Sequence, residues 1–237
     1  ADQFKGKTKA GPHGDFIFEL DYIVGELLGA LDKHGFSDNT LVIFSSDNGP
    51  EVPTVLSMRK DHKHDGARPW RGVKRDNWEG GHRVPFIARW PGKIKPGRVS
   101  DHLWYFPDVM PTLAEITGAK AEEDTDGISI VPELIGAKAA GRKQEKHKYL
   151  YWELGQHTAV RMGDWKAVRP GGKSDWQLFN LKKDISEAHD VAADNPKVMN
   201  QIKAIAEEAH EPSVEGTFAD TTNHEKDRAA KYGGTRP

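Results

Sequence analysis

Two polar side chains follow an apolar segment at a place where proteins often bind metal ions. Asp47 and Asn48 come after the run at 41–44, Leu-Val-Ile-Phe, and precede Gly49. In open α/β sheets, ligands bind beyond the carboxyl ends of strands. Carboxylate and amide oxygens suit a hard cation such as Ca²⁺, which takes about 6–8 oxygen ligands. We therefore predict Asp47 and Asn48 as metal ligands, with further ligands supplied from elsewhere. The alternative is that Asp-Asn-Gly is simply a turn.

Two cations follow some 25 residues later in a Trp-Arg-Gly-Val-Lys segment, at Arg71 and Lys74. A lysine is a compact point charge that suits a tetrahedral anion, and arginine binds oxyanions through its planar fork. We predict Arg71 and Lys74 as substrate-binding residues, with Lys74 contacting the reacting anion. Taken alone, both could equally be solvated loop cations.

The segment at 79–85, Glu-Gly-Gly-His-Arg-Val-Pro, carries a third signal. Its paired glycines permit a tight backbone path that a Cβ atom could block. We expect Arg83 to be structural and to pair with an acid near the sheet. The alternative is an ordinary loop before a strand.

Other residues offer weaker signals. Asp61, His62, His64 and Asp65 could resemble a metal cluster, but such residues gather readily in polar loops. The tryptophans at 152 and 176 could line a sugar site, although packing is the favoured interpretation. His13 lies in a Gly-Pro-His-Gly turn, and we assign no catalytic role to it.

The elements that must position these residues are helices and apolar strands in alternation, which is typical of an α/β protein. A helix is predicted from Asp15 to His34, capped by Asp15 and stopped by Gly35. A continuously apolar strand at 40–46 and a second strand at 84–90 predict a largely parallel sheet covered on both faces. Residues 49–70 are predicted to be a surface insertion, and 101–118 a strand followed by a helix. The apolar positions of the first helix share one face: Phe16, Leu20, Ile23, Val24, Leu27, Leu28 and Leu31.

The pattern changes near residue 137, where a second unit is predicted. Turns separate short apolar segments, which predicts a small antiparallel sheet with strands at 149–153, 159–162, 165–169 and 176–181. Pro196 then opens a helix, with Asn195 as its cap. We divide the chain into an α/β part at 1–136, an α+β subdomain at 137–211 and a polar tail at 212–237.

Composition narrows the function. Of 237 residues, 36 are acidic and 34 basic, so nothing favours a nucleic acid or an anionic membrane as partner. The absence of cysteine excludes disulfides and thiolate zinc sites. No apolar run is long enough to predict a membrane span, and no signal peptide or phosphate-binding glycine loop is recognisable. The chain begins at Ala1 without Met, which fits processing, truncation or partial coverage of a longer protein.

In combination, these motifs resemble the C-terminal half of the type I (arylsulfatase-like) sulfatases, of the alkaline phosphatase-like superfamily. The resemblance runs from about Phe4 to about Pro212. Its pieces keep a consistent order: Gly14-Asp15, Leu20-Asp21, the segments 39–49 and 71–74, Glu79 to Pro85, Trp90-Pro91-Gly92, the segments 108–113 and 126–129, and Leu178 to Leu181 with Asp184.

The resemblance implies part of an alkaline phosphatase-like sandwich and a sulfuric ester hydrolase. It implies that Asp47 and Asn48 bind Ca²⁺ and that Lys74 contacts the sulfate. The family nucleophile, a formylglycine made in a Cys/Ser-x-Pro-x-Arg motif, is expected upstream of this segment. The implied partners are a sulfated small molecule or glycan and the missing N-terminal part of the same protein. A periplasmic or extracellular location is expected.

Two alternatives stay open. A phosphate or phosphonate monoester hydrolase of the same superfamily would differ in its nucleophile and metal. A non-catalytic anion- or sugar-binding remnant could bind sulfate without turnover. The identity of the nucleophile separates both from a sulfatase.

Overall fold

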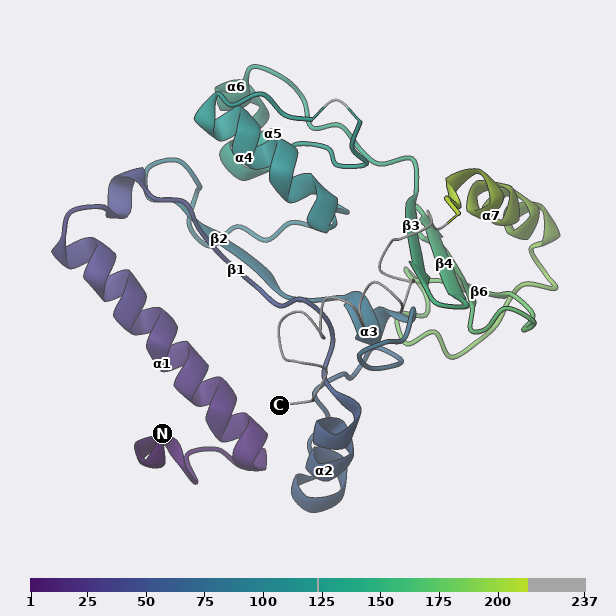
Figure 1. The fold of residues 1–237 in the computed structure, drawn as a ribbon, viewed down its shortest axis with the longest axis horizontal. Helices are drawn as coiled ribbons and strands as arrows, with labels where there is room; N and C mark the ends of the chain where they lie inside the picture. The colour runs from purple at the N-terminus through teal and green to yellow at the C-terminus, as the bar shows by residue number, and fades with distance from the viewer. Residues whose placement is uncertain (123, 213–237) are drawn as a thin grey trace, which may run out of the picture.

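The computed structural model describes residues 1–122 and 124–212, so the predicted tail lies almost entirely outside the described residues. Two groups of elements follow one another along the chain (Figure 1). The first contains two strands with helices, and the second a four-stranded sheet with one helix. In the described part of the chain, no helix combines the length and apolar character needed to cross a bilayer.

The first long helix, α1 (Gly11–Lys33), begins four residues before the predicted start. Pro12 lies in its first turn, where its missing N–H costs nothing. Asp15 is therefore inside the helix, and its carboxylate accepts hydrogen bonds from the backbone N–H groups of Gly6 and Thr8 instead of capping. The predicted buried face is not buried within the described structure, because α1 contains no buried residue.

Strands β1 (Val42–Ser45) and β2 (Phe86–Arg89) form the predicted core sheet, but they pair antiparallel, with Val42 opposite Arg89. The expectation of a mostly parallel sheet is therefore wrong for the described strands. The local apolar pattern predicts a strand, but it does not fix the direction of a partner about 40 residues away. Neither strand is covered on both faces, and Ile87 remains 61% exposed.

Residues predicted as a surface insertion contain a helix, α2 (Val52–His62). Glu51 caps it by accepting from the Val52 N–H, and Pro53 lies in its first turn. Val55 and Met58, three residues apart, form its buried contact. The apolar residues of this segment do not repeat with a clear helical period, because charged residues follow directly after Met58.

A cluster of short helices follows β2, and it is organised around a buried carboxylate. The strand predicted at the start of 101–118 does not form, and the chain instead enters η3 (Phe106–Asp108) and then α4 (Val109–Thr117), the helix predicted to follow. Asp108, fully buried, accepts from the N–H groups of Tyr105 and Ile128 and contacts His147 Nε2 at 2.9 Å. These contacts join the start of α4 to the segments that contain α5 (Val131–Ile135) and α6 (Ala137–Ala140).

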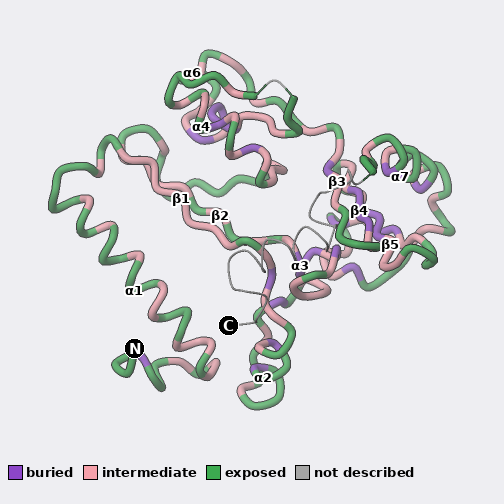
Figure 2. Tube along the Cα trace, in the orientation of Figure 1, coloured by how far each residue is buried: buried purple, intermediate pink, exposed green. Residues whose placement is uncertain are grey.

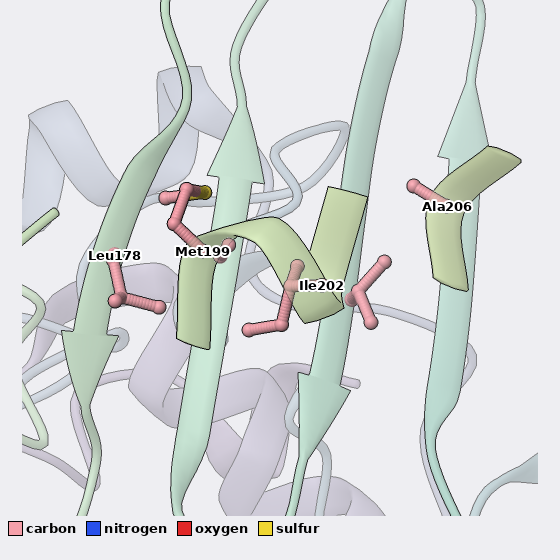
Figure 3. Close-up of a cluster of buried hydrophobic side chains, with 6 residues drawn as sticks. Leu178, Met199, Ile202 and Ala206 are labelled. Atoms are coloured by element: carbon pink, nitrogen blue, oxygen red, sulfur yellow. The ribbon is translucent and has the colours of Figure 1, made fainter. Parts of the chain in front are cut away.

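The second sheet confirms the predicted meander. Its order is β3 (Leu150–Leu154), β4 (His157–Met162), β5 (Trp165–Arg169) and β6 (Gln177–Asn180), all antiparallel. Helix α7 (Pro196–Ala209) crosses one face of this sheet and buries Met199, Ile202 and Ala206 in a cluster to which the sheet contributes Leu178 (Figure 3). The Asn195 side chain does not cap α7; it donates to the Val191 carbonyl.

Burial is uneven between the two groups of elements. Buried segments gather in the second sheet, its helix and the short helix α3 (Glu79–His82), while α1 shows only intermediate and exposed segments (Figure 2). Helix α3 lies between the β1–β2 pair and the second sheet (Figure 1). The residues of the predicted site surround α3.

Candidate functional site

The predicted cation ligands lie where β1 ends. Asp47 is exposed and lines an open pocket of about 360 Å³ together with Ser45, Ser46 and Phe106. Among the described residues, no donor contacts the Asp47 carboxylate. Asn48 donates through Nδ2 to the Gly49 carbonyl, which leaves its Oδ1 available as an acceptor. The Asp47 carboxylate at the pocket rim and the Asn48 amide oxygen beside it in the chain are chemically suited to a hard cation.

These two residues cannot complete a cation shell. No group of three or more His, Cys, Asp or Glu residues that could hold a metal occurs in the described part of the chain. A Ca²⁺ ion here would need its remaining oxygens from water, substrate or another part of the protein.

The predicted anion contact, Lys74, is tied to the same region by its backbone. Its N–H donates to the Pro50 carbonyl at 3.0 Å, one residue after the turn that contains Asn48. Its ammonium group lies 3.5 Å from Glu51 Oε2 and is 34% exposed. Glu51 also accepts from Arg75, whose hydrogen bond lowers the pKa of the Glu51 carboxyl. Such an exposed pair is weak, so Lys74 can exchange Glu51 for an anion at little cost.

Helix α3 packs beneath both loops through its backbone. The Gly49 N–H donates to the Gly81 carbonyl at 2.8 Å, and the Gly80 N–H donates to the Arg71 carbonyl at 2.7 Å. A Cβ atom on Gly49 would lie 1.8 Å from the Gly80 oxygen, and one on Gly81 would lie 2.0 Å from the Asp76 oxygen. The predicted tight path of the Glu-Gly-Gly segment is therefore confirmed, since side chains at these positions cannot fit.

Arg71 lies differently from Lys74. Its guanidinium stacks 4.1 Å above the Trp78 ring and donates to the Glu187 carbonyl at 3.0 Å. These contacts hold the Arg71 loop against the segment after β6. They favour a structural contribution, and the role of Arg71 in substrate binding stays a prediction.

A buried charge cluster connects α3 to the second sheet, and sequence reasoning missed most of it. Lys166 of β5 is fully buried, and its ammonium group donates to Glu79 Oε1 and to His82 Nε2, both at 2.9 Å. It also lies 3.1 Å from Glu187 Oε1. Glu187 in turn accepts from the Glu79 N–H at 2.7 Å. The one signal in the sequence was a lysine among the apolar residues of the segment Trp-Lys-Ala-Val at 165–168.

The electrostatics of this cluster follow from burial and pairing. Burial opposes ionisation of Glu79, but the charge and hydrogen bond of Lys166, together with the neighbouring His82 and Arg161, outweigh it and lower the pKa of Glu79 to about 2. Burial, followed by the Lys166 charge, lowers the pKa of His82 to about 3, so the imidazole is neutral and its Nε2 can accept from Lys166. Burial raises the pKa of Glu187. Arg83, predicted to be structural, pairs with Glu79 at 3.1 Å, which confirms that expectation.

The weaker candidates find structural partners. Asp65 pairs with Arg59 and Arg68 and accepts from the Ala67 N–H, while the His62 ring lies against Gly11. The Trp152 ring packs on His82 at 4.4 Å between centroids, and Arg169 lies over Trp176 at 5.3 Å. These contacts favour packing roles for both tryptophans.

Two family profiles match the chain. The profile described as Sulfatase covers residues 3–119, and the one described as N-sulphoglucosamine sulphohydrolase, C-terminal, covers residues 71–213. A curated relative, N-acetylgalactosamine-6-O-sulfatase from Bacteroides thetaiotaomicron, is 30% identical over 224 residues, which are 86% of this chain and 43% of the relative.

Solved structures agree with this likeness. One from Bacteroides thetaiotaomicron, whose description concerns the metabolism of multiple glycosaminoglycans, superposes with a TM-score of 0.72 at 29% identity, over 87% of this chain and 46% of that chain. The structure of Ps i-CgsB in complex with k-i-k-neocarrahexaose superposes with a TM-score of 0.68 at 30% identity, over 93% of this chain and 48% of that chain. The present chain thus spans less than half the length of these proteins.

Proposed function

Because the chain belongs to the sulfatase family, we propose that the protein containing it is an arylsulfatase-like sulfuric ester hydrolase that removes sulfate from an aryl or carbohydrate ester. One observation carries the proposal. The Asp47 carboxylate, without a protein donor among the described residues, lines a pocket, and the Lys74 loop is hydrogen-bonded to the segment directly after it. The proposed cation ligands and the Lys74 ammonium group are thereby held on adjacent loops.

The proposed roles follow from side-chain chemistry. Asp47 and Asn48 hold Ca²⁺ through one carboxylate and one amide oxygen. A bound Ca²⁺ would withdraw charge from the sulfate oxygens. Lys74 stabilises the negative charge that develops on the sulfate in the transition state. Arg71, stacked on Trp78, keeps the Lys74 loop in place, and a direct contact with substrate is the alternative role.

The rest of the active centre belongs to the N-terminal part of the same protein in this proposal. That part supplies the formylglycine, which provides the nucleophile, and the remaining calcium ligands. The family resemblance supports this division, and so does a described segment that offers two oxygen ligands where about 6–8 are needed.

A sulfated glycan is the proposed substrate class. The support comes from relatives: one is named for N-acetylgalactosamine-6-O-sulfate chemistry, and another was solved with an oligosaccharide. Such a substrate places the protein in the periplasm or outside the cell, a location that the family resemblance also suggests.

The test is turnover of the full-length protein and two variants. We expect wild-type protein to hydrolyse an aryl sulfate and a sulfated N-acetylhexosamine in the presence of Ca²⁺ and to lose activity in a chelator. Asp47→Ala and Lys74→Ala should each lower kcat/KM by about 100-fold or more, the usual effect of removing one group that stabilises transition-state charge. Lys60→Ala, an exposed lysine on α2, is the matched control and should retain wild-type rates. Unchanged turnover in both site variants would overturn the assignment.

The same assay separates the two alternatives. Faster cleavage of phosphate than of sulfate esters would favour a phosphate or phosphonate monoester hydrolase. Sulfate binding without any turnover by the full-length protein would favour a non-catalytic remnant.

A further inference from the structure

Helix α3 is the common support of both proposed binding loops. Gly49, which follows the cation ligands, rests on the backbone of Gly81, and the Arg71 carbonyl accepts from the Gly80 N–H. A Cβ atom on Gly80 would lie 2.4 Å from the Gly72 oxygen. The backbone of α3 is therefore packed directly against the backbone of the Lys74 loop. A shift of α3 would therefore move the cation loop and the anion loop together.

The second sheet holds α3 from the opposite side through charge. Lys166 and Glu187 both belong to this part of the chain, and together they contact the side chain and the N–H of Glu79, the first residue of α3. Glu187 also accepts from Arg71 through its own carbonyl at 3.0 Å. One pair of buried residues thus contacts both α3 and the loop that carries Lys74.

Stability alone does not account for this arrangement. Well-packed apolar residues of similar volume often stabilise a protein as well as, or better than, a buried ion pair. The best-supported use of buried charge is to fix one arrangement of the packed parts, because an ion without its partner is costly in the interior. The geometry matches that use, since Lys166 has three partners within 3.1 Å, and two of them, Glu79 and His82, lie on α3.

We propose that Lys166 and Glu187 are positioning residues for the sulfatase site, through which the second sheet sets the placement of α3 and thereby the geometry of the Asp47–Asn48 loop and of Lys74. This inference rests on the proposed function. It assigns the second sheet a role in cation binding and turnover, beyond contacts with the substrate.

The test measures Ca²⁺ affinity by isothermal titration calorimetry, together with the Ca²⁺ dependence of kcat and KM, in the full-length protein. Lys166→Met keeps the length of the side chain and removes its charge. Glu187→Gln keeps an oxygen that can accept from the Glu79 N–H and is the milder change. Lys173→Met, an exposed lysine between β5 and β6, is the matched control.

We expect Lys166→Met to raise the half-saturating Ca²⁺ concentration by about 10-fold or more, which is the effect typical of losing outer-shell support at a metal site. Glu187→Gln should shift it in the same direction by a smaller factor, and kcat at saturating Ca²⁺ should fall more than KM rises. Lys173→Met should match wild type.

A purely structural role predicts a different result. Both variants would then lower the Tm, while the folded fraction kept wild-type kcat, KM and Ca²⁺ dependence, and that outcome would overturn the inference. If Lys166→Met does not fold, Glu187→Gln decides alone. Wild-type protein without Ca²⁺-dependent sulfate release would instead overturn the proposed function.

Discussion

At the scale of single residues, the site combines exposed ligands with a buried charge cluster. Asp47 and Lys74 face solvent and can meet a cation and an anion. Glu79 and Lys166 are held out of water a short distance away, with the partly buried His82 beside them, where effective dielectric constants are lower and charge interactions stronger. The first set can bind ligands, and the second holds the backbone that presents them.

The neutral state of the partly buried His82 side chain predicts that the folded protein is sensitive to acid. Its pKa is about 3 in the folded protein and 6.5 in an unfolded chain, so the unfolded state binds more protons between these values. Stability is therefore lost as pH falls below 6.5. The loss between pH 6.5 and pH 4.5 is on the order of 2 kcal/mol, at about 1.4 kcal/mol per pH unit. Glu187, whose pKa is raised, opposes part of this trend.

Replacing His82 should make the free energy of unfolding depend less on pH. Chemical denaturation of the full-length protein at several pH values would show a smaller decline for His82→Gln than for wild type, because glutamine does not titrate. His189→Gln is the control, since that side chain is 84% exposed. Equal slopes for His82→Gln and wild type would contradict a buried neutral imidazole.

At the scale of elements, local pattern predicted some of the structure well. Strand β5 was predicted at both ends, and the α7 start at Pro196 was also predicted, because turn residues and a proline mark those boundaries. Helix α3 was not predicted, since two of its four residues are glycines with poor helix propensity. Tertiary contacts of the Glu79 side chain stabilise it instead.

The apolar contacts between α7 and the second sheet should contribute much of the stability of the unit that these elements form. Ile202 is fully buried against the sheet. Ile202→Ala should lower the free energy of unfolding by about 2–5 kcal/mol, through lost burial and the cavity left behind. Lys203→Ala, the exposed neighbour, should change it by less than about 0.5 kcal/mol. Urea denaturation measures both, and a small effect at Ile202 would show that α7 packs loosely.

At the scale of the whole molecule, the first group of elements exposes an unusual amount of apolar surface. Phe16 and Leu27 on α1 are 60% and 62% exposed, Ile87 on β2 is 61% exposed, and Met110 on α4 is 70% exposed. Exposed patches of this kind mark contact surfaces. The chain spans less than half of its relatives, and we propose that the N-terminal part of the protein covers this surface.

Residues 1–237 alone should therefore self-associate through this exposed apolar surface. We expect this fragment to enhance the fluorescence of a hydrophobic dye and to self-associate in sedimentation experiments, because its apolar helix face lacks a cover. The full-length protein, the natural control, should do neither. A monomeric fragment that leaves the dye dark would refute the proposed cover.

Contacts between residues far apart in the sequence could not be predicted from the sequence, for a physical reason. Asp47, Asn48 and Lys74 can be proposed from the sequence, because their side chains suit a cation or an anion and each follows an apolar or glycine-bearing segment. The Lys166 and Glu187 contacts to Glu79 span 87 and 108 residues, so no local spacing reveals them. The antiparallel direction of the β1–β2 pair could not be predicted for the same reason, since the two strands lie about 40 residues apart in the chain.

The glycine contacts beneath the site have a consequence for engineering substrate range. Gly49, Gly80 and Gly81 meet one another and their neighbours through backbone atoms, so a Cβ at any of them collides with main chain that cannot rotate away. Exposed side chains of the adjoining helix α2 face no such constraint. A mutagenesis library should therefore keep these three glycines fixed, whereas the exposed positions of α2 can be varied without disturbing the backbone packing beneath the proposed site.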